Sequence, residues 1–224
     1  MIELYLDTVD AEQVARFNQC LPVKGVTTNP SILAKAGIGV NQSLSDLVDI
    51  LGADARFHVQ VISQTVAEIV EEAIKINALP YDMVIKVPAN EIGLAAIKRI
   101  KKQNIQVLAT AIYSVQQGFM AALSGADYLA PYVNRMDTMG GNGIAVVADL
   151  QTLIANNNLK CMLLPASFKN TQQVIEVMKL GVEAITIPVD IAGQMLTHPA
   201  IEPAVQQFDQ DWRAAFGDKM SFNS

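Results

Sequence analysis

The chain of 224 residues is long enough for one domain with a full hydrophobic core. Hydrophobic residues make up 51% of it and charged residues 17%, which excludes a disordered protein. The net charge of −6 argues against a nucleic-acid binder, because phosphate backbones require a basic face, but it leaves room for small anionic ligands.

Cysteine and histidine usage predicts neither a disulfide framework nor a metal site. Cys20 and Cys161 form no CxxC pair, and His58 and His198 lack ligand-like spacing, so we expect structural histidines. Met1 leads directly into a strand pattern, without a basic segment followed by a long apolar run. We therefore expect a cytoplasmic, metal-independent protein that does not interact with membranes.

Eight short apolar runs alternate with helical patterns along the chain. In order they are Ile2–Thr8, Val23–Asn29, Arg56–Ser63, Met83–Ala89, Gln106–Tyr113, Asp127–Val133, Lys160–Ser167 and Ala184–Asp190. Most are rich in Val, Ile and Leu without strict alternation, which is typical of parallel strands covered by helices. Amphipathic segments such as Val66–Leu79, Glu91–Gln103 and Thr171–Leu180 lie between them and have helical spacing.

Eight strand–helix units without a linker predict an α/β fold, a single-domain (β/α)8 TIM barrel spanning residues 1–224. A doubly wound open sheet is the alternative, but no glycine-rich nucleotide-binding loop follows any run. The stretch Ala204–Phe216 predicts an extra C-terminal helix with Phe208 and Trp212 on one apolar face. That face could pack on its own barrel or on a neighbouring subunit.

Polar residues recur near the ends of the first seven runs. They are Asp7, Thr27, Thr28, Asn29, Gln60, Lys86, Thr110, Tyr132, Arg135, Ser167 and Lys169. Any one of them could simply start a turn. In a (β/α)8 barrel, however, the carboxyl ends of the strands meet at one face, where the chemistry takes place. Their recurrence in corresponding places therefore indicates a shared site.

Lys86 follows three apolar residues and precedes Val87-Pro88. Burial disfavours the charged form, so its pKa should fall below the usual value of about 10.4, and a neutral amine can attack a carbonyl carbon. The alternatives are a lysine that reaches solvent and one that merely pairs with Asp7. The pattern alone leaves all three open.

Two groups of residues could act together with such a lysine, one in proton transfer and the other in substrate binding. Asp7 and Tyr132 can donate or accept a proton, while Gln60 and Thr110 can hold a water molecule. A second group combines two cations and a hydroxyl, which suits a phosphate. It consists of Arg135, Ser167 and Lys169. Surface charge with a helix cap would give the same pattern as this second group.

Four motifs resemble the transaldolase family. They are Gly25–Ser31 (GVTTNPS), Val84–Pro88 (VIKVP), Ala130–Arg135 (APYVNR) and Ala166–Lys169 (ASFK). They are most similar to the small fructose-6-phosphate aldolase branch, and the similarity runs from Ile2 to Gly217. The resemblance implies class I aldolase chemistry on a (β/α)8 barrel, with a covalent Schiff base and no metal or organic cofactor.

The resemblance also implies roles for individual residues. Lys86 matches the Schiff-base lysine, Asp7 the acidic residue and Tyr132 the acid/base tyrosine. Gln60 and Thr110 match residues that orient a catalytic water.

The remaining matches concern the substrate. Thr27 and Asn29 match contacts to the bound hydroxyketone, and Arg135, Ser167 and Lys169 match the phosphate site. Among partners, the resemblance implies sugar phosphates, hydroxyketones and a homo-oligomer, a ring-like decamer whose terminal helix reaches a neighbour.

Three positions separate the branches of the family. Classical transaldolases carry Glu, Phe and Ser where this chain has Gln60, Tyr132 and Ala130, so the chain resembles the aldolase branch. The expected enzyme is an aldehyde-lyase that reversibly cleaves fructose 6-phosphate into dihydroxyacetone and glyceraldehyde 3-phosphate. The alternatives are a transaldolase that passes the dihydroxyacetone unit to erythrose 4-phosphate, and a barrel that binds sugar phosphates without turnover.

Overall fold

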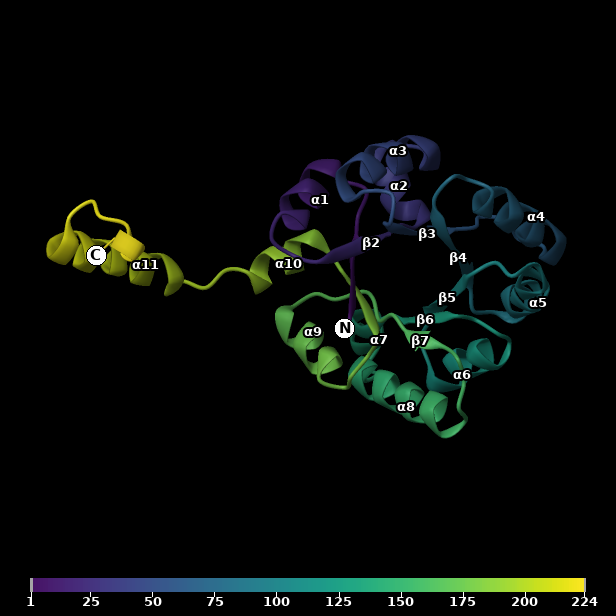
Figure 1. The fold of residues 1–224 in the computed structure, drawn as a ribbon. Coiled ribbons are helices and arrows are strands. Elements are labelled where there is room, and N and C mark those ends of the chain that lie inside the picture. The colour runs from purple at the N-terminus through teal and green to yellow at the C-terminus, as the bar shows by residue number, and fades with distance from the viewer. Residues whose placement is uncertain (1, 224) are drawn as a thin grey trace. The chain divides into compact units, whose positions relative to one another are not determined.

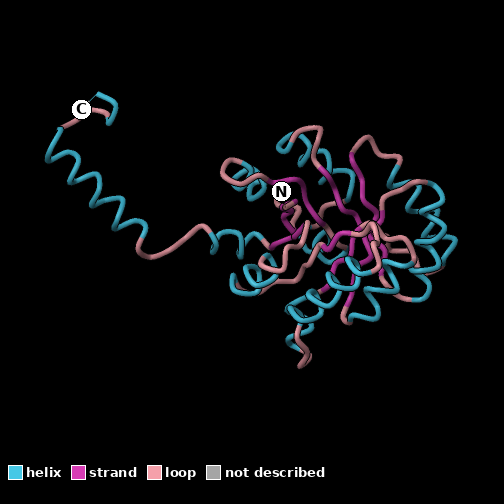
Figure 2. Tube along the Cα trace, turned by 60° about the horizontal axis from the view of Figure 1, so that its bottom comes forward, coloured by secondary structure: helices cyan, strands magenta, loops and turns pink. Residues whose placement is uncertain are grey.

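The computed structural model describes residues 2–223, which divide after Ile191 into two compact units. In the first unit a ring of helices surrounds the strands, which lie side by side at its centre (Figure 1, Figure 2). Strands and helices alternate along the chain, as the sequence pattern predicts.

The strands form one parallel sheet that closes on itself. In chain order they are β1 (Glu3–Asp7), β2 (Val23–Thr27), β3 (Arg56–Gln60), β4 (Asp82–Pro88), β5 (Val107–Ile112), β6 (Tyr128–Pro131), β7 (Met162–Leu163) and β8 (Ala184–Ile187). Their order in the sheet is β7-β6-β5-β4-β3-β2-β1-β8, with every pair parallel. The Thr186 amide donates to the Pro165 carbonyl at 3.2 Å and links the two ends. The (β/α)8 barrel is confirmed, and the open doubly wound sheet is wrong.

The helices of the barrel follow the strands. They are α1 (Ala11–Asn18), α2 (Pro30–Ala36), α3 (Val40–Leu51), α4 (Val66–Asn77), α5 (Glu91–Ile100), α6 (Val115–Leu123), α7 (Val133–Thr138), α8 (Gly143–Asn156), α9 (Thr171–Met178) and α10 (Val189–Met195). Side chains that precede many of them accept a hydrogen bond from the amide three residues later, namely Asp10, Asn29, Thr65, Asn90, Ser114, Asn142 and Asn170. These bonds satisfy amides without a partner inside the helix, so each helix begins at a defined residue.

The seventh apolar run yields a much shorter strand than predicted. Of Lys160–Ser167, the structure makes Met162–Leu163 regular strand. Pro165 has no amide hydrogen to donate, and Ser167 adopts a left-handed backbone with φ of 64°. Regular pairing therefore stops early, and the chain that follows is free to line the carboxyl end of the barrel.

A layer of buried side chains fills the barrel beneath that end. Its members are Tyr5, Val84, Leu108, Tyr128, Ala130, Leu164 and Ala184. Side chains alternate along a strand, so the residue two positions later also points inward, one layer nearer the carboxyl end. Five such positions hold Asp7, Lys86, Thr110, Tyr132 and Thr186. The apolar layer is thus the floor beneath a layer of polar side chains.

His58 is buried among the aromatic residues of this floor. Its ring centroid lies 4.7 Å from that of Tyr5 and 5.3 Å from that of Tyr128. Neither ring nitrogen has a hydrogen-bond partner within residues 2–223. Burial, reinforced by the charges of Lys86 and Arg56, holds the pKa of His58 well below its usual value. The ring is therefore neutral and packs as part of the floor.

The second unit contains the C-terminal helix α11 (Ile201–Phe216). It begins before the predicted Ala204, because Pro203 is tolerated in the first turn, where its missing amide hydrogen would have no helical partner. Phe208 on this helix is 69% exposed. The second unit therefore presents apolar surface, as the sequence pattern predicts.

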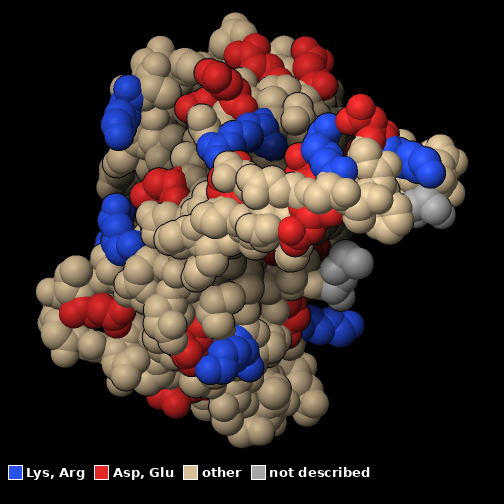
Figure 3. Space-filling model, turned by 90° about the vertical axis from the view of Figure 1, so that its left-hand side faces the viewer, with Lys and Arg blue, Asp and Glu red and all other residues tan. Residues whose placement is uncertain are grey.

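Acidic and basic side chains are interspersed over the face that Figure 3 draws. This distribution agrees with a net charge of −6 in a chain with 16 basic and 22 acidic residues. Within residues 2–223, the structure has no helix with the length and apolar character needed to span a membrane.

Candidate active site

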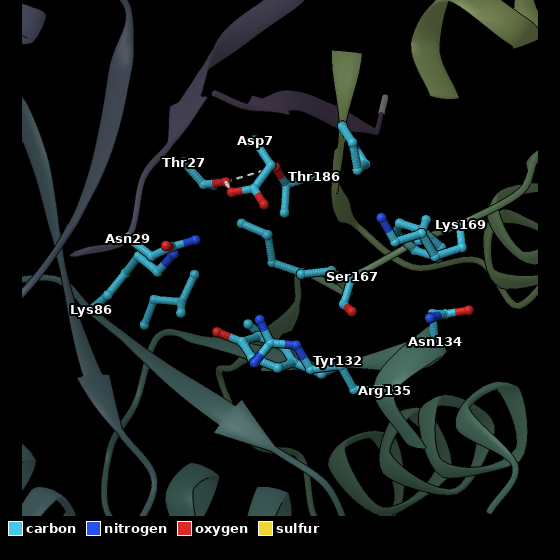
Figure 4. A pocket seen from close by; sticks show the side chains of 16 residues that line it. Asp7, Thr27, Asn29, Lys86, Tyr132, Asn134, Arg135, Ser167, Lys169 and Thr186 are labelled. Atoms are coloured by element: carbon cyan, nitrogen blue, oxygen red, sulfur yellow. Dashed lines mark hydrogen bonds between the residues drawn. The ribbon is translucent and has the colours of Figure 1, made fainter. Parts of the chain in front are cut away.

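A pocket of about 230 Å³ lies at the carboxyl ends of the strands. Its wall includes every residue that the sequence analysis assigned to the site except Thr28, Gln60 and Thr110. In Figure 4, Lys86 and Asn29 lie on one side of the pocket, and Ser167 and Lys169 lie on the other. This volume lies below the usual range for drug-sized ligands, about 300–1,000 Å³, and therefore suits a small metabolite rather than a dinucleotide.

Lys86 projects from β4 into this pocket. Its side chain is 5% exposed, and Nζ donates a hydrogen bond to the Thr28 carbonyl at 2.5 Å. Within residues 2–223, no carboxylate forms an ion pair with it, so neither solvent exposure nor pairing with Asp7 explains this lysine. Burial lowers the pKa of Lys86, while the charge of Asp7 raises it to a lesser extent. The site therefore favours a neutral amine, the form that attacks carbonyl carbons.

Asp7 is held in place by two threonine hydroxyls. The Thr27 hydroxyl donates to Asp7 Oδ1 at 2.7 Å and lies 2.8 Å from the Thr186 hydroxyl (Figure 4). Because Thr27 has a single hydroxyl proton, which Asp7 accepts, Thr186 must donate to Thr27. A chain of hydroxyls from β8 through β2 therefore orients the carboxylate at the end of β1.

Tyr132 is the residue that caps α7, directly after β6. Its hydroxyl lies 2.9 Å from the hydroxyl of Thr110, and the guanidinium of Arg135 lies over its ring, 4.6 Å from the centroid. Burial raises the pKa of Tyr132, although the Thr110 hydrogen bond and the Arg135 charge oppose this effect. The phenol is therefore protonated at neutral pH and can donate a proton to a bound substrate.

Asn29 serves both α2 and the pocket. Its Oδ1 accepts a hydrogen bond from the Ile32 amide at 3.0 Å and caps the helix, which Pro30 opens. Since Oδ1 is bound in this way, the amide NH2 is the group that remains for a ligand. The motif Gly25–Ser31 therefore places a fixed donor beside Lys86.

Arg135, Ser167 and Lys169 also line the pocket. Neither cation pairs with a carboxylate of residues 2–223, and Arg135 donates to the Tyr113 hydroxyl at 3.2 Å. Ser167 is held with φ of 64°, a conformation that costs a non-glycine residue about 1–2 kcal/mol. Two cations without a carboxylate partner beside a hydroxyl residue have the chemistry that suits an anionic group.

Gln60 and Thr110 differ from the other predicted residues. Thr110 lies behind Tyr132, which it contacts, and Gln60 lines a neighbouring cavity although its backbone is in register with Lys86. The prediction that Arg135 lies at the end of the sixth strand is wrong. It lies in helix α7, which starts directly after β6 and the capping residue Tyr132. The other predicted site residues, apart from Thr28, line one pocket.

Sequence reasoning missed two polar residues of the pocket wall, Asn134 and Thr186. Thr186 occupies the same inward position on β8 as Lys86 on β4, and a lone threonine in the apolar run Ala184–Asp190 was the available signal. Asn134 directly precedes Arg135 and had no signal of its own beyond that motif.

A (β/α)8 barrel with a buried lysine and a tyrosine in its mouth has the groups that Schiff-base chemistry needs. Residues 4–223 match the family model described as Transaldolase/Fructose-6-phosphate aldolase. The chain belongs to this family, which consists of enzymes with transaldolase- or aldolase-type Schiff-base chemistry.

Solved structures of other proteins share the fold. One is a Sinorhizobium meliloti protein in an open loop conformation, with 13% identity and a TM-score of 0.62 over 85% of this chain and 52% of that one. Another is thiamine phosphate pyrophosphorylase from Pyrococcus furiosus, with 18% identity and a TM-score of 0.54 over 84% of this chain and 85% of that one. The chain thus spans about half the length of the first protein. At these identities the likeness concerns the fold alone.

Proposed function

We propose that this protein is a class I aldolase that reversibly cleaves fructose 6-phosphate into dihydroxyacetone and glyceraldehyde 3-phosphate. The observation that carries the proposal is the buried amine of Lys86, which faces a pocket shared with the protonated hydroxyl of Tyr132. A neutral amine and a neutral phenol together supply the nucleophile and the proton donor that Schiff-base chemistry needs.

In the synthetic direction, Lys86 Nζ attacks the carbonyl carbon of dihydroxyacetone, and the carbinolamine loses water to give the protonated Schiff base. Removal of a proton from the adjacent carbon gives the enamine, which adds to the aldehyde carbon while the aldehyde oxygen takes up a proton. Water then releases the product and restores the amine. Tyr132 and Asp7 are the groups placed to move these protons, with Thr110 bonded to Tyr132.

The anionic end of the pocket supports a phosphorylated aldehyde. Arg135 and Lys169 supply two cations and Ser167 supplies a hydroxyl to the pocket wall. Ser167 and Lys169 lie on the side away from Lys86, and Arg135 lies with Tyr132 (Figure 4). A phosphate bound there would hold the reacting carbon of a short aldehyde in the space between the two sides. The reaction uses the covalent lysine adduct in place of a cofactor.

A transaldolase is the second candidate, because the family unites both activities and both use the same lysine. The protonated hydroxyl of Tyr132 favours the aldolase, since it can protonate the enamine and let dihydroxyacetone leave without an acceptor. A phenylalanine there would leave the enamine waiting for an acceptor sugar.

The test is the release of dihydroxyacetone from fructose 6-phosphate alone. We expect steady release without erythrose 4-phosphate, abolished in Lys86→Met and retained in the exposed-site control Lys98→Met. Turnover that starts only after erythrose 4-phosphate is added would make the protein a transaldolase. Release that survives in Lys86→Met would contradict both candidates.

A further inference from the structure

Gln173 is buried in the first turn of α9, yet it does not line the pocket. It is 8% exposed, and all of its polar atoms are bonded. Oε1 accepts from the Lys169 amide at 2.9 Å, while Nε2 donates to Asn134 Oδ1 at 3.2 Å and to Asp137 Oδ2 at 2.8 Å. One side chain thus joins the loop after β7 to helix α7.

The segments that Gln173 joins are the two that build the anionic end of the pocket. The loop after β7 carries Ser167 and Lys169, and α7 carries Asn134 and Arg135. Backbone bonds also connect them, from the Val133 amide to the Ala166 carbonyl at 3.0 Å and from the Asn134 amide to the Ser167 carbonyl at 2.8 Å. Gln173 extends this connection to the Lys169 amide and to the Asn134 side chain, which the backbone bonds do not reach.

A second glutamine, Gln117, accepts a backbone amide in the same way as Gln173, and the comparison shows how the two differ. After β5, the Tyr113 amide donates to Gln117 Oε1 at 2.8 Å, two residues beyond Ala111, which is left-handed with φ of 57°. Lys169 stands in the same relation to left-handed Ser167. The Nε2 of Gln117, however, donates to backbone carbonyls, at 2.8 and 2.9 Å. Gln173 instead binds side chains of another helix.

We propose that Gln173 is a positioning residue that fixes Lys169 and Asn134 relative to each other, and that it thereby sets the preference of the enzyme for aldehydes that carry a phosphate. The inference rests on the proposed function. It assigns Gln173 no contact with the substrate, because its three hydrogen bonds are all made within the protein.

The expected effect is specific to the anionic end. In Gln173→Met the side chain keeps its length and its lack of charge but loses all three hydrogen bonds. Lys169 and Asn134 then lose their common support, and a support held by hydrogen bonds of this kind is worth about a tenfold change in affinity. Lys86 lies on β4, outside both segments, and keeps its bond to Thr28, while the Tyr132 hydroxyl keeps its contact with Thr110 on β5.

The experiment compares two aldehydes in the synthetic direction with dihydroxyacetone. For Gln173→Met we expect the KM for glyceraldehyde 3-phosphate to rise about tenfold, while the KM for unphosphorylated glyceraldehyde changes by less than about twofold. The matched control is Gln172→Met, the exposed neighbour, whose amide donates to Glu176 at 2.7 Å and which should leave both KM values unchanged. Equal changes for both aldehydes, or none, would overturn the inference.

A second variant covers the case in which Gln173→Met does not fold. Gln173→Glu keeps an acceptor for the Lys169 amide but loses both donors, and Gln172→Glu is the control for its added charge. The same selective rise in KM is expected for Gln173→Glu relative to that control. If the ratio of the KM for glyceraldehyde 3-phosphate to the KM for glyceraldehyde is the same in Gln173→Glu and Gln172→Glu, the inference is wrong.

Binding of inorganic phosphate, followed by phosphorus NMR line width, separates this inference from the proposed function. We expect Gln173→Met to bind phosphate about tenfold more weakly than the parent protein and Gln172→Met to bind it equally. A parent protein without aldolase turnover would refute the proposed function and leave this comparison intact. Phosphate binding that is the same in both variants, or absent from the parent, would overturn the inference.

Discussion

Burial acts in opposite directions on the two central groups of the site. It lowers the pKa of Lys86 and raises the pKa of Tyr132, because in each case the charged form is the one that loses its hydration. The pocket therefore shifts Lys86 toward the neutral amine, which can attack, and Tyr132 toward the protonated phenol, which can donate. Groups shifted apart in this way by their surroundings are typical of acid–base catalysis.

The lowered pKa of Lys86 predicts how adduct formation depends on pH. Since the pKa lies below the usual 10.5, the neutral fraction persists at lower pH than in an exposed lysine, and it is lost only as the pH falls through the shifted value. We expect trapping of dihydroxyacetone by cyanoborohydride to be half-maximal below pH 10.5. Labelling of exposed Lys98 controls for the reagent, and a midpoint at or above the usual value would contradict the burial argument.

Tyr132 should act after the Schiff base has formed. Removing its hydroxyl in Tyr132→Phe leaves Lys86 and its bond to Thr28 intact but takes away the proton donor. We expect aldol turnover to fall about 100-fold or more, the usual loss for a general acid, while adduct trapping falls less than about tenfold. Parallel losses of turnover and trapping would make Tyr132 a structural residue.

Individual site residues differed in how visible they were in the sequence. Lys86 stood out because burying a charged side chain inside an apolar strand costs free energy, so such a residue is usually paired or functional. Thr186 did not stand out, because a threonine is common in strands and its role appears only when β8 closes beside β1 and β2. Its bond to Thr27 is a product of barrel closure, which spacing along the chain cannot express.

Among the elements, the close packing of β2 against β3 depends on Gly25. A Cβ at this position would lie 1.8 Å from the Arg56 carbonyl oxygen, a backbone atom that cannot move aside alone. Glycine in a strand interior is typical of such close approach. The motif Gly25–Ser31 therefore begins with a packing requirement and ends with residues of the pocket.

The clash predicts a loss of stability in Gly25→Ala. We expect the free energy of unfolding to fall by about 3 kcal/mol or more, measured by urea denaturation, because overpacking against backbone forces the strands apart. The matched control is Gly39→Ala, where an added Cβ meets nothing within 4 Å, and there we expect a loss below about 1 kcal/mol. Equal losses in the two variants would show that Gly25 has no packing role.

Element boundaries were predicted well where capping residues mark them, as at Thr65 before α4 and Asn170 before α9. They were predicted poorly around β7, where an apolar run continues although regular pairing stops. The short helix α7 was hidden for a similar reason, since its residues read as the end of a strand. Around β7 the cause is the backbone itself, because Pro165 has no amide hydrogen and Ser167 is left-handed, and neither feature interrupts an apolar pattern.

For the whole molecule, eight repeated units were sufficient to predict the barrel, because parallel strands linked by helices and lacking a nucleotide loop have few other arrangements. The closure itself, through β8 against β1, required the structure. Assembly into an oligomer through α11 stays a prediction from the resemblance, consistent with the exposed Phe208.

The central claim, that Lys86 forms the Schiff base, is tested most directly by borohydride reduction in the presence of dihydroxyacetone, followed by peptide mass spectrometry. If Lys86 forms the Schiff base, one reduced three-carbon unit is added to the peptide containing Lys86. This label should disappear in Lys86→Met and persist in Lys98→Met. A label on a different lysine, or no label on any peptide, would contradict it.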